Sequence, residues 1–192
     1  MALHVFEERY QRLLEDIGSV GGRFGIVLIE RGNEVGGGDQ RFDVGTVVEV
    51  VNDIALGDSG HRMVAVRGLQ RFRVQDWLPD DIYPVAEVSF FGDHDAIDEG
   101  VLATTESAVR AVRNLASEVN LDDACHQPLA DLATSPGTKA WQLCSLAPMA
   151  TLDQLSVLKL PTMDDRLKVV AEICCERYGD LQRQLQGDAR DY

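Results

Sequence analysis

The stretch ERGNEVGGGDQRFDVGT, residues 30–46, is the first candidate for chemistry, because it carries five of the chain's 17 glycines. Two standard glycine-rich motifs bind phosphate. A P-loop needs G-x-x-x-x-G-K-[ST], and every lysine of this chain lies beyond residue 138. A dinucleotide-binding loop needs G-x-G-x-x-G at the start of a helix, whereas here Arg41 occupies the sixth position and a strand-like segment follows. The stretch therefore matches neither phosphate-binding motif.

The same stretch is typical of a connection between two strands. The flanking segments Phe24–Ile29 and Val44–Val51 are rich in β-branched residues, and glycine permits the tight turns that a connection needs. The connection is longer than a minimal hairpin and carries charges of both signs, among them Arg31 and Glu34. Long polar loops often carry function, so both an architectural loop and a binding loop remain open.

Two further groups of residues could support chemistry but lack a recognisable pattern. The acidic stretch GDHDAIDE, residues 92–99, has neither the glycine nor the glutamate that an EF-hand loop requires, and carboxylates at the start of a helix explain it more simply. CHQP, residues 125–128, places a cysteine beside a histidine, but adjacent residues rarely face each other. G-x-S-x-G and H-E-x-x-H do not occur in the sequence. We therefore predict no enzymatic activity, no cofactor and no metal site.

The four cysteines predict neither a disulfide framework nor a structural zinc site. They stand at positions 125, 144, 174 and 175 and include no C-x-x-C pair. Cys174 and Cys175 fall in a helical pattern, where neighbouring side chains diverge by about 100°. We expect buried or half-buried thiols in a reducing compartment.

Net charge and hydropathy restrict the partners. With 18 basic and 32 acidic residues the chain carries a formal net charge of −14, which would repel a nucleic-acid backbone. A membrane-spanning helix needs about 20 consecutive apolar residues, and the most apolar stretch, FGIVLI, is far shorter. We predict a cytoplasmic protein that binds neither nucleic acid nor membrane.

The pattern of apolar residues divides the chain into two parts. Residues 4–17 have the apolar spacing of an amphipathic helix, and short segments rich in β-branched and aromatic residues follow. The predicted strands are Phe24–Ile29, Val44–Val51, Met63–Val66, Phe72–Trp77 and Val85–Phe91. So many short strands predict a mostly antiparallel sheet that curls into a barrel or a sandwich.

Beyond residue 92 the apolar period becomes that of helices. Apolar residues between Ile97 and Val119 form one stripe, and a short helix around Trp141 ends at Pro148. Thr151 and Thr162 each start a further helix, the first with the T-x-x-Q spacing of a capping box. We predict an α+β chain in which a β-barrel subdomain, residues 1–92, precedes a helical-bundle subdomain, residues 93–192.

Three motifs resemble the N-terminal, substrate-binding domain of the Lon protease family. The segment LHVFEERY carries the family's helix signature at Leu3, His4, Val5, Phe6, Glu7, Arg9 and Tyr10. A phenylalanine–glycine strand start follows at Phe24 and Gly25, and a valine–glycine–threonine strand at Val44, Gly45 and Thr46. The resemblance continues less specifically into LAPMATLDQLSVLKLPTMDDRLKVV. It therefore covers most of the chain.

The resemblance implies a PUA-like β-barrel followed by a helical bundle, and a role in recognising polypeptides. The P-loop ATPase and the serine–lysine peptidase of a whole Lon protease do not occur in this sequence, so it resembles a stand-alone relative of the recognition module. Family members usually carry a strand before the helix signature, and here only Met1 and Ala2 precede it. Either the first strand is lost or the chain starts late relative to its relatives, and a lost strand would leave a neighbouring strand edge uncovered. We therefore expect a homodimer that covers this edge.

The leading hypothesis is a non-catalytic module that binds unfolded or specific protein substrates, with a protease as an expected partner. The candidate contact residues are Arg31, Glu34, Arg41, Phe42 and Asp43. Strand addition and groove binding are both compatible with this role. The alternative hypothesis is RNA binding, because PUA domains in other proteins bind RNA. The negative charge argues against it.

Overall fold

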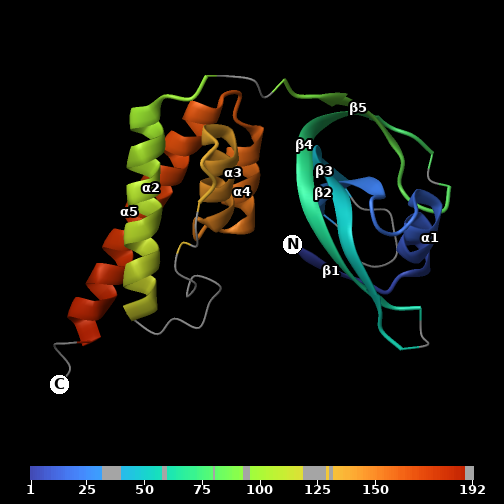
Figure 1. The fold of residues 1–192 in the computed structure, drawn as a ribbon, viewed down its shortest axis with the longest axis horizontal. Helices are drawn as coiled ribbons and strands as arrows, with labels where there is room; N and C mark the ends of the chain where they lie inside the picture. The colour runs from blue at the N-terminus through green and yellow to red at the C-terminus, as the bar shows by residue number, and fades with distance from the viewer. Residues whose placement is uncertain are drawn as a thin grey trace. The chain divides into compact units, whose positions relative to one another are not determined.

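The computed structural model describes residues 1–31, 40–57, 60–79, 81–92, 96–118, 129 and 132–188. These residues form an antiparallel sheet with one short helix, followed by helices alone, which confirms the predicted α+β class (Figure 1). The chain divides into two compact units, Met1–Gly92 and Asp93–Tyr192. We call them the sheet unit and the helical unit.

The sheet unit is built around its two longest strands. Its elements are β1 (Ala2–Val5), α1 (Glu8–Ile17), β2 (Arg23–Arg31), β3 (Gln40–Ala55), β4 (Arg62–Trp77) and β5 (Ala86–Phe90). The strand order is β1-β4-β3-β2, and β5 also pairs with β4. All the pairings are antiparallel. The sheet is strongly curved, and β4 follows the curve along its whole length (Figure 1).

A β-bulge explains why two strands predicted separately form one continuous strand, β4. Val48 pairs with Gly68 and Val47 with Gln70, so that Leu69 is an extra residue on β4. A bulge increases local twist and bends the strand without ending it. The predicted strands Met63–Val66 and Phe72–Trp77 are therefore the two ends of β4.

The start of the chain differs from the prediction. A helix from residue 4 was expected, but Ala2–Val5 form β1, which pairs with Ala65–Arg62 of β4, and α1 begins only at Glu8. Leu3 and Val5 point into the core of the sheet unit, and this alternation over four residues is too short to separate from helical spacing in the sequence alone. The edge of β4 at residues 62–65 is thus covered by the chain itself. The uncovered edge on which the expected homodimer rested is not found there.

Helix α1 covers one face of the curved sheet. Leu14 is buried against Val48, Val50, Val64 and Val66 from the two central strands. Smaller contacts come from Leu3, Val5, Ile17, Phe24 and Ile26. This face forms the hydrophobic core of the sheet unit.

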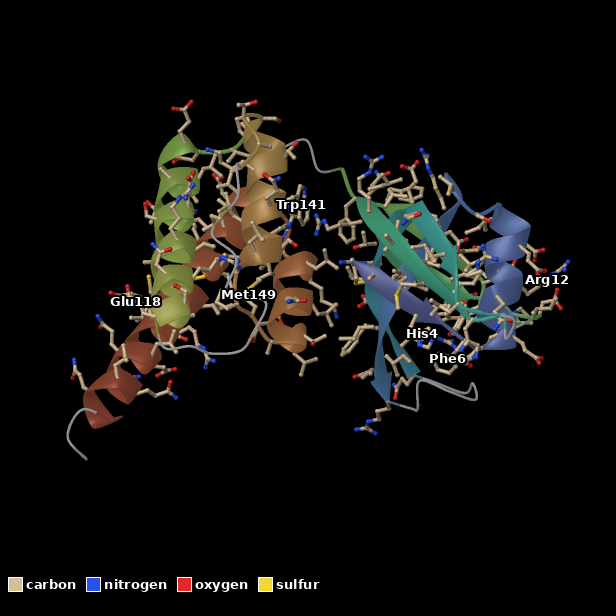
Figure 2. The ribbon with its side chains drawn as sticks, turned by 60° about the horizontal axis from the view of Figure 1, so that its bottom comes forward. His4, Phe6, Arg12, Glu118, Trp141 and Met149 are labelled. Carbon is tan, nitrogen blue, oxygen red and sulfur yellow. The ribbon has the colours of Figure 1, made fainter. Side chains whose placement is uncertain are left out.

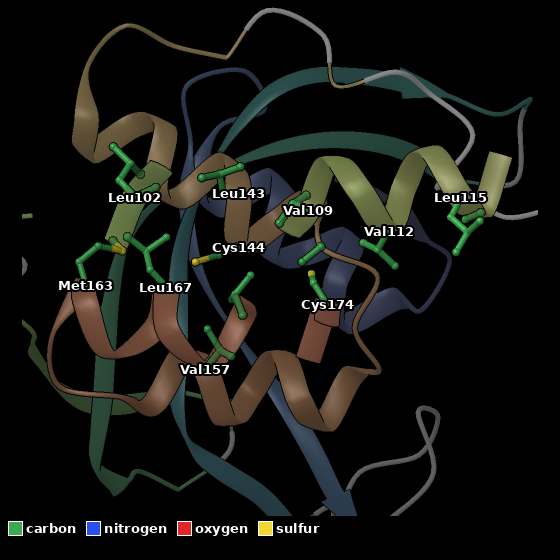
Figure 3. Packing of buried hydrophobic residues seen from close by; sticks show 14 of the residues in the cluster. Leu102, Val109, Val112, Leu115, Leu143, Cys144, Val157, Met163, Leu167 and Cys174 are labelled. Carbon is green, nitrogen blue, oxygen red and sulfur yellow. The ribbon is translucent and has the colours of Figure 1, made fainter. Parts of the chain in front are cut away.

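The helical unit packs α2 (Glu99–Glu118), α3 (Pro136–Leu146) and α4 (Thr151–Lys159) against the long helix α5 (Met163–Asp188). Helices α2 and α5 lie side by side and run in the same direction (Figure 1). Their facing stripes meet in one apolar core, and Figure 3 shows how α3 and α4 complete it. The core includes the fully buried Val109, Val112, Leu143, Leu167 and Val170.

A buried arginine joins the helices of this unit. Arg166 on α5 is 1% exposed, and its Nη2 donates hydrogen bonds to the carbonyl oxygens of Leu160, at 2.8 Å, and Pro161, at 3.2 Å. Its guanidinium also lies 5.0 Å from the centre of the Trp141 ring on α3. These contacts offset the cost of burying a charge. They hold the turn between α4 and α5 against α3.

The same burial affects the neighbouring thiol. Burial raises the pKa of Cys144 to about 11, against the opposing effect of the Arg166 charge. Cys174 is also buried, as predicted, whereas Cys175 is exposed because adjacent helical side chains point in different directions. Cys125 lies outside the described residues. None of the helices in the described ranges is long and apolar enough to cross a bilayer.

The two predicted helix starts differ in their caps. Thr162 caps α5: its Oγ1 accepts a hydrogen bond from the backbone N–H of Asp165 at 3.1 Å and donates one to the Asp165 carboxylate at 2.7 Å. The capping box predicted at Thr151 is wrong. Ala150 occupies the N-cap of α4, and Gln154 donates to the Met149 carbonyl oxygen instead.

This difference predicts unequal effects of two similar substitutions. Thr162→Ala should lower the free energy of unfolding by about 1 kcal/mol, because it removes the side chain that satisfies the N–H of Asp165. Thr151→Ala, the matched control, should change it by less than about 0.5 kcal/mol. Guanidinium unfolding followed by far-UV circular dichroism measures both values. Equal effects would contradict the assigned caps.

Candidate functional site

The candidate site is the face of the sheet opposite α1, which we call the outer face. Residues paired across antiparallel strands share a face, so the register identifies its members. The central row runs across four strands and contains Val27, Gly45, Phe72 and Phe90. The next rows contain the pairs Gly25–Val47 and Val74–Val88. We call Val27, Val47, Phe72, Val74, Val88 and Phe90 the outer apolar band.

Two glycines create the space for the central ring of the band. A Cβ placed at Gly45 would lie 2.6 Å from Cζ of Phe72 and 2.4 Å from the carbonyl oxygen of Ile26. A Cβ at Gly25 would lie 2.9 Å from the same Cζ atom. The Phe72 ring therefore lies directly over the backbone of β2 and β3. It is only 4% exposed.

The band becomes accessible at strand β5. Val88 is 39% and Phe90 58% exposed, whereas their partners on β4 are less exposed: Val74 is half-buried and Phe72 is buried. The strand alternates apolar and polar residues, with Glu87 between two apolar side chains. Over the described residues β5 pairs only with β4, so its other edge is open. An open edge beside exposed apolar side chains can accept another extended chain.

Charged groups flank the band on the outer face. At one end Glu49 accepts hydrogen bonds from Arg67 at 2.6 Å and from Arg23 at 3.2 Å, and the two guanidinium groups lower the pKa of its carboxyl, Arg67 more than Arg23. Near the other end the guanidinium of Arg41 lies 4.9 Å from the centre of the Trp77 ring. The band thus lies between an ion-paired row and an arginine stacked on tryptophan.

The structure places the sequence-predicted contact residues near this second end. Arg31 pairs with Gln40 where β2 and β3 meet, and Arg41 pairs with Ile29. Phe42 is half-buried, and the exposed Asp43 lies 3.9 Å from the guanidinium of Arg73. Glu34 lies outside the described residues. Four of the five residues therefore lie at one end of the β2–β3 pair.

Sequence reasoning missed the residues that the register adds to them. Trp77, Val88 and Phe90 come from β4 and β5, far along the chain from the glycine-rich stretch. Their alternation in AEVSF was a usable signal for a strand with one apolar face. Nothing in it specified which strands would lie beside that face.

The acidic stretch at residues 92–99 contributes a helix cap. Its described residue Asp98 accepts a hydrogen bond from the backbone N–H of Val101 at 2.9 Å, at the start of α2. Asp93, His94 and Asp95, like the pair Cys125–His126, fall outside the described residues. Within the described ranges no three histidine, cysteine or carboxylate side chains are arranged to hold a metal ion.

Comparisons with known proteins identify the family to which this chain belongs. Residues 1–176 match the family described as "ATP-dependent protease La (LON) substrate-binding domain". The chain belongs to the Lon substrate-binding domain family. The Lon protease of Anaeromyxobacter dehalogenans (strain 2CP-C) is 26% identical over 154 residues. That match covers 78% of this chain and 18% of the protease.

Solved structures extend this similarity to the fold. The Lon N-terminal domain protein from Xanthomonas campestris is 27% identical, with a TM-score of 0.58 over 88% of this chain and 85% of that one. The N-terminal domain of the Mycobacterium avium complex Lon protease has the same TM-score at 14% identity, over 91% of this chain and 90% of that one. The latter shows similarity of fold alone. The resemblance drawn from the sequence motifs is therefore confirmed.

The close contact beneath Phe72 predicts a difference between two strand glycines of this Lon-type domain. Gly45→Ala should lower the free energy of unfolding by about 2 kcal/mol, because its Cβ would overlap both the carbonyl oxygen of Ile26 and the Phe72 ring. Gly68→Ala should have little effect, since its Cβ would meet only Thr46 Cγ2, at 3.5 Å. Urea denaturation of both variants tests this. If both tolerate alanine equally, the described close packing of Ile26 and Phe72 around Gly45 is wrong.

Proposed function

We propose that the outer face of the sheet unit binds polypeptide segments, and that this non-catalytic module recognises protein substrates for proteolysis. The observation that carries the proposal is the exposure of Val88 and Phe90 on an open-edged strand. Membership of a family described as a substrate-binding domain supports the choice of a polypeptide as the ligand. A protease is the expected partner to which such a module would deliver the bound chain.

Strand addition at β5 is the binding mode that these features favour. A bound segment would donate and accept backbone hydrogen bonds along the open edge of β5. Every second side chain of the segment would then lie on the outer face beside Val88 and Phe90. Backbone pairing requires no particular sequence, and the band adds a preference for apolar residues. This combination suits a module that recognises exposed segments of many unfolded proteins.

The residues at the end of the β2–β3 pair would extend this contact surface. Arg41 presents a guanidinium held on Trp77, and Asp43 and Arg73 are exposed charges beside it. Together with Arg31, Phe42 and Glu34, they are proposed to contact polar groups of the bound segment. Their part in binding is separable from that of the apolar band by mutation.

Substitution in the apolar band tests the proposal directly. The double variant Val88→Thr/Phe90→Asn removes the two exposed apolar side chains of the band, with threonine, a good strand former, inside β5 and asparagine only at its last residue. Its affinity for a permanently unfolded, fluorescently labelled polypeptide should fall by about tenfold, which corresponds to about 1.4 kcal/mol. Fluorescence anisotropy measures the affinity, and circular dichroism verifies the fold. Ile54→Thr, which removes a 51% exposed apolar side chain of β3 outside the band, is the control and should bind normally.

Two further outcomes limit the proposal. If Arg41→Ala/Phe42→Ala binds the unfolded polypeptide as tightly as the unaltered protein, these two residues are not part of the site. RNA binding would appear as retention of labelled RNA on filters at low salt, where phosphate contacts are strongest. Retention of RNA, together with normal polypeptide binding by Val88→Thr/Phe90→Asn, would overturn the proposed function.

A further inference from the structure

The helical unit contains a groove whose lining residues all belong to that unit and not to the outer face. It has a volume of about 660 Å³ and is lined by α2, the α3–α4 connection, α4 and α5. Figure 2 shows Met149, on that connection, beside α2. A volume of this size lies within the range of small-ligand sites, and it can hold several side chains of a bound segment.

The base of the groove is apolar and firmly held. Val112, Ala116, Ala147 and Leu181 line the groove but are buried, whereas Leu146, Pro148, Met149 and Ile173 are half-buried and give it accessible apolar surface. The Nη1 of Arg113 donates a hydrogen bond of 2.9 Å to the carbonyl oxygen of Leu146, which ties the end of α3 to α2. The groove is therefore a fixed feature of the helix packing.

Carboxylates from two helices stand at its rim. Asp153 on α4 and Glu176 on α5 are exposed, and neither forms an ion pair or a hydrogen bond through its side chain with any other described residue. Asp180, a third acidic residue of the rim, forms an ion pair with Arg183. Arg177 contributes one positive charge to the rim, and the buried Arg113 contributes a second positive charge to the lining. The carboxylates of Asp153 and Glu176 thus face an apolar groove and have no cation of their own within the described part of the chain.

We propose that this groove is a second docking site, for a polypeptide segment that carries a lysine or arginine beside apolar residues. The apolar side chains of the segment would cover the base of the groove, and its cation would pair with Asp153 and Glu176. Charge complementarity favours this occupant over an acidic segment, because the lining carries three carboxylates against two guanidinium groups, and Asp153 and Glu176 form no ion pair with the described residues. The pairing is partly solvent-exposed, so binding should weaken as salt concentration rises.

The test uses the whole chain and three labelled peptides of equal length. The first alternates leucine with lysine, the second replaces lysine with glutamate, and the third replaces leucine with serine. In the Val88→Thr/Phe90→Asn background, in which the outer face is weakened, only the leucine–lysine peptide should bind tightly in fluorescence anisotropy. The variant Asp153→Asn/Glu176→Gln should bind it about tenfold more weakly, whereas Glu99→Gln/Glu172→Gln, which removes two exposed charges outside the groove, should bind it normally.

Three results would overturn the inference. They are equal binding of the lysine and glutamate peptides, unchanged affinity of Asp153→Asn/Glu176→Gln, and backbone amide shifts in NMR spectra that avoid the residues lining the groove. A concentration-dependent dimer that is lost in the same variant would assign the groove to a second copy of the chain instead. Val88→Thr/Phe90→Asn should retain binding of the leucine–lysine peptide at the groove, so that failure of this site and failure of the outer face can be distinguished.

Discussion

The sheet unit depends on the continuity of β4. This one strand pairs with β1, β3 and β5, so three of its neighbours are positioned by a single run of backbone. A straight strand of 16 residues could not follow the curve of the sheet. The extra residue at Leu69 allows the bend while the pairing with β3 continues on both sides. One end of β4 can therefore contribute Val64 and Val66 to the core beneath α1, while the other contributes Phe72 and Val74 to the outer face.

On the outer face, the lack of side chains at two glycines shapes the proposed binding surface. Phe72 is accommodated because Gly25 and Gly45 leave room for its ring, and the ring in turn extends the band toward β5. Apolar side chains that are buried in the middle of the band become exposed at its edge. A polypeptide that pairs with β5 would continue both the hydrogen bonding of the sheet and its apolar surface. The proposed recognition of unfolded segments would then need no catalytic group.

The helical unit solves a different packing problem. Arg166 is a buried charge, and burial of an unpaired charge would be costly. Two carbonyl oxygens at the α4–α5 turn and the Trp141 ring surround its guanidinium, so the residue fixes the positions of α3, α4 and α5 together. The connection from α3 to α4, which includes Met149, then passes beside α2. The groove lies where this connection, α2, α4 and α5 meet. A fixed helix arrangement can therefore present rim carboxylates that are distant in the sequence.

The sequence by itself determined what depends on neighbouring residues. It excluded the standard phosphate loops, located the helical stripes and most strands, and indicated the family through short motifs. Each of these signals lies within a short continuous segment of the chain. It also predicted the cap at Thr162, although not the absence of one at Thr151, since a capping motif does not decide where the preceding chain enters the helix. Only the tertiary structure decided that Ala2–Val5 pair with β4, that Val27, Phe72 and Phe90 share a row, and that Asp153 and Glu176 line one groove. Strand register and helix packing bring together residues that are far apart along the chain, and no local pattern specifies which of them will meet.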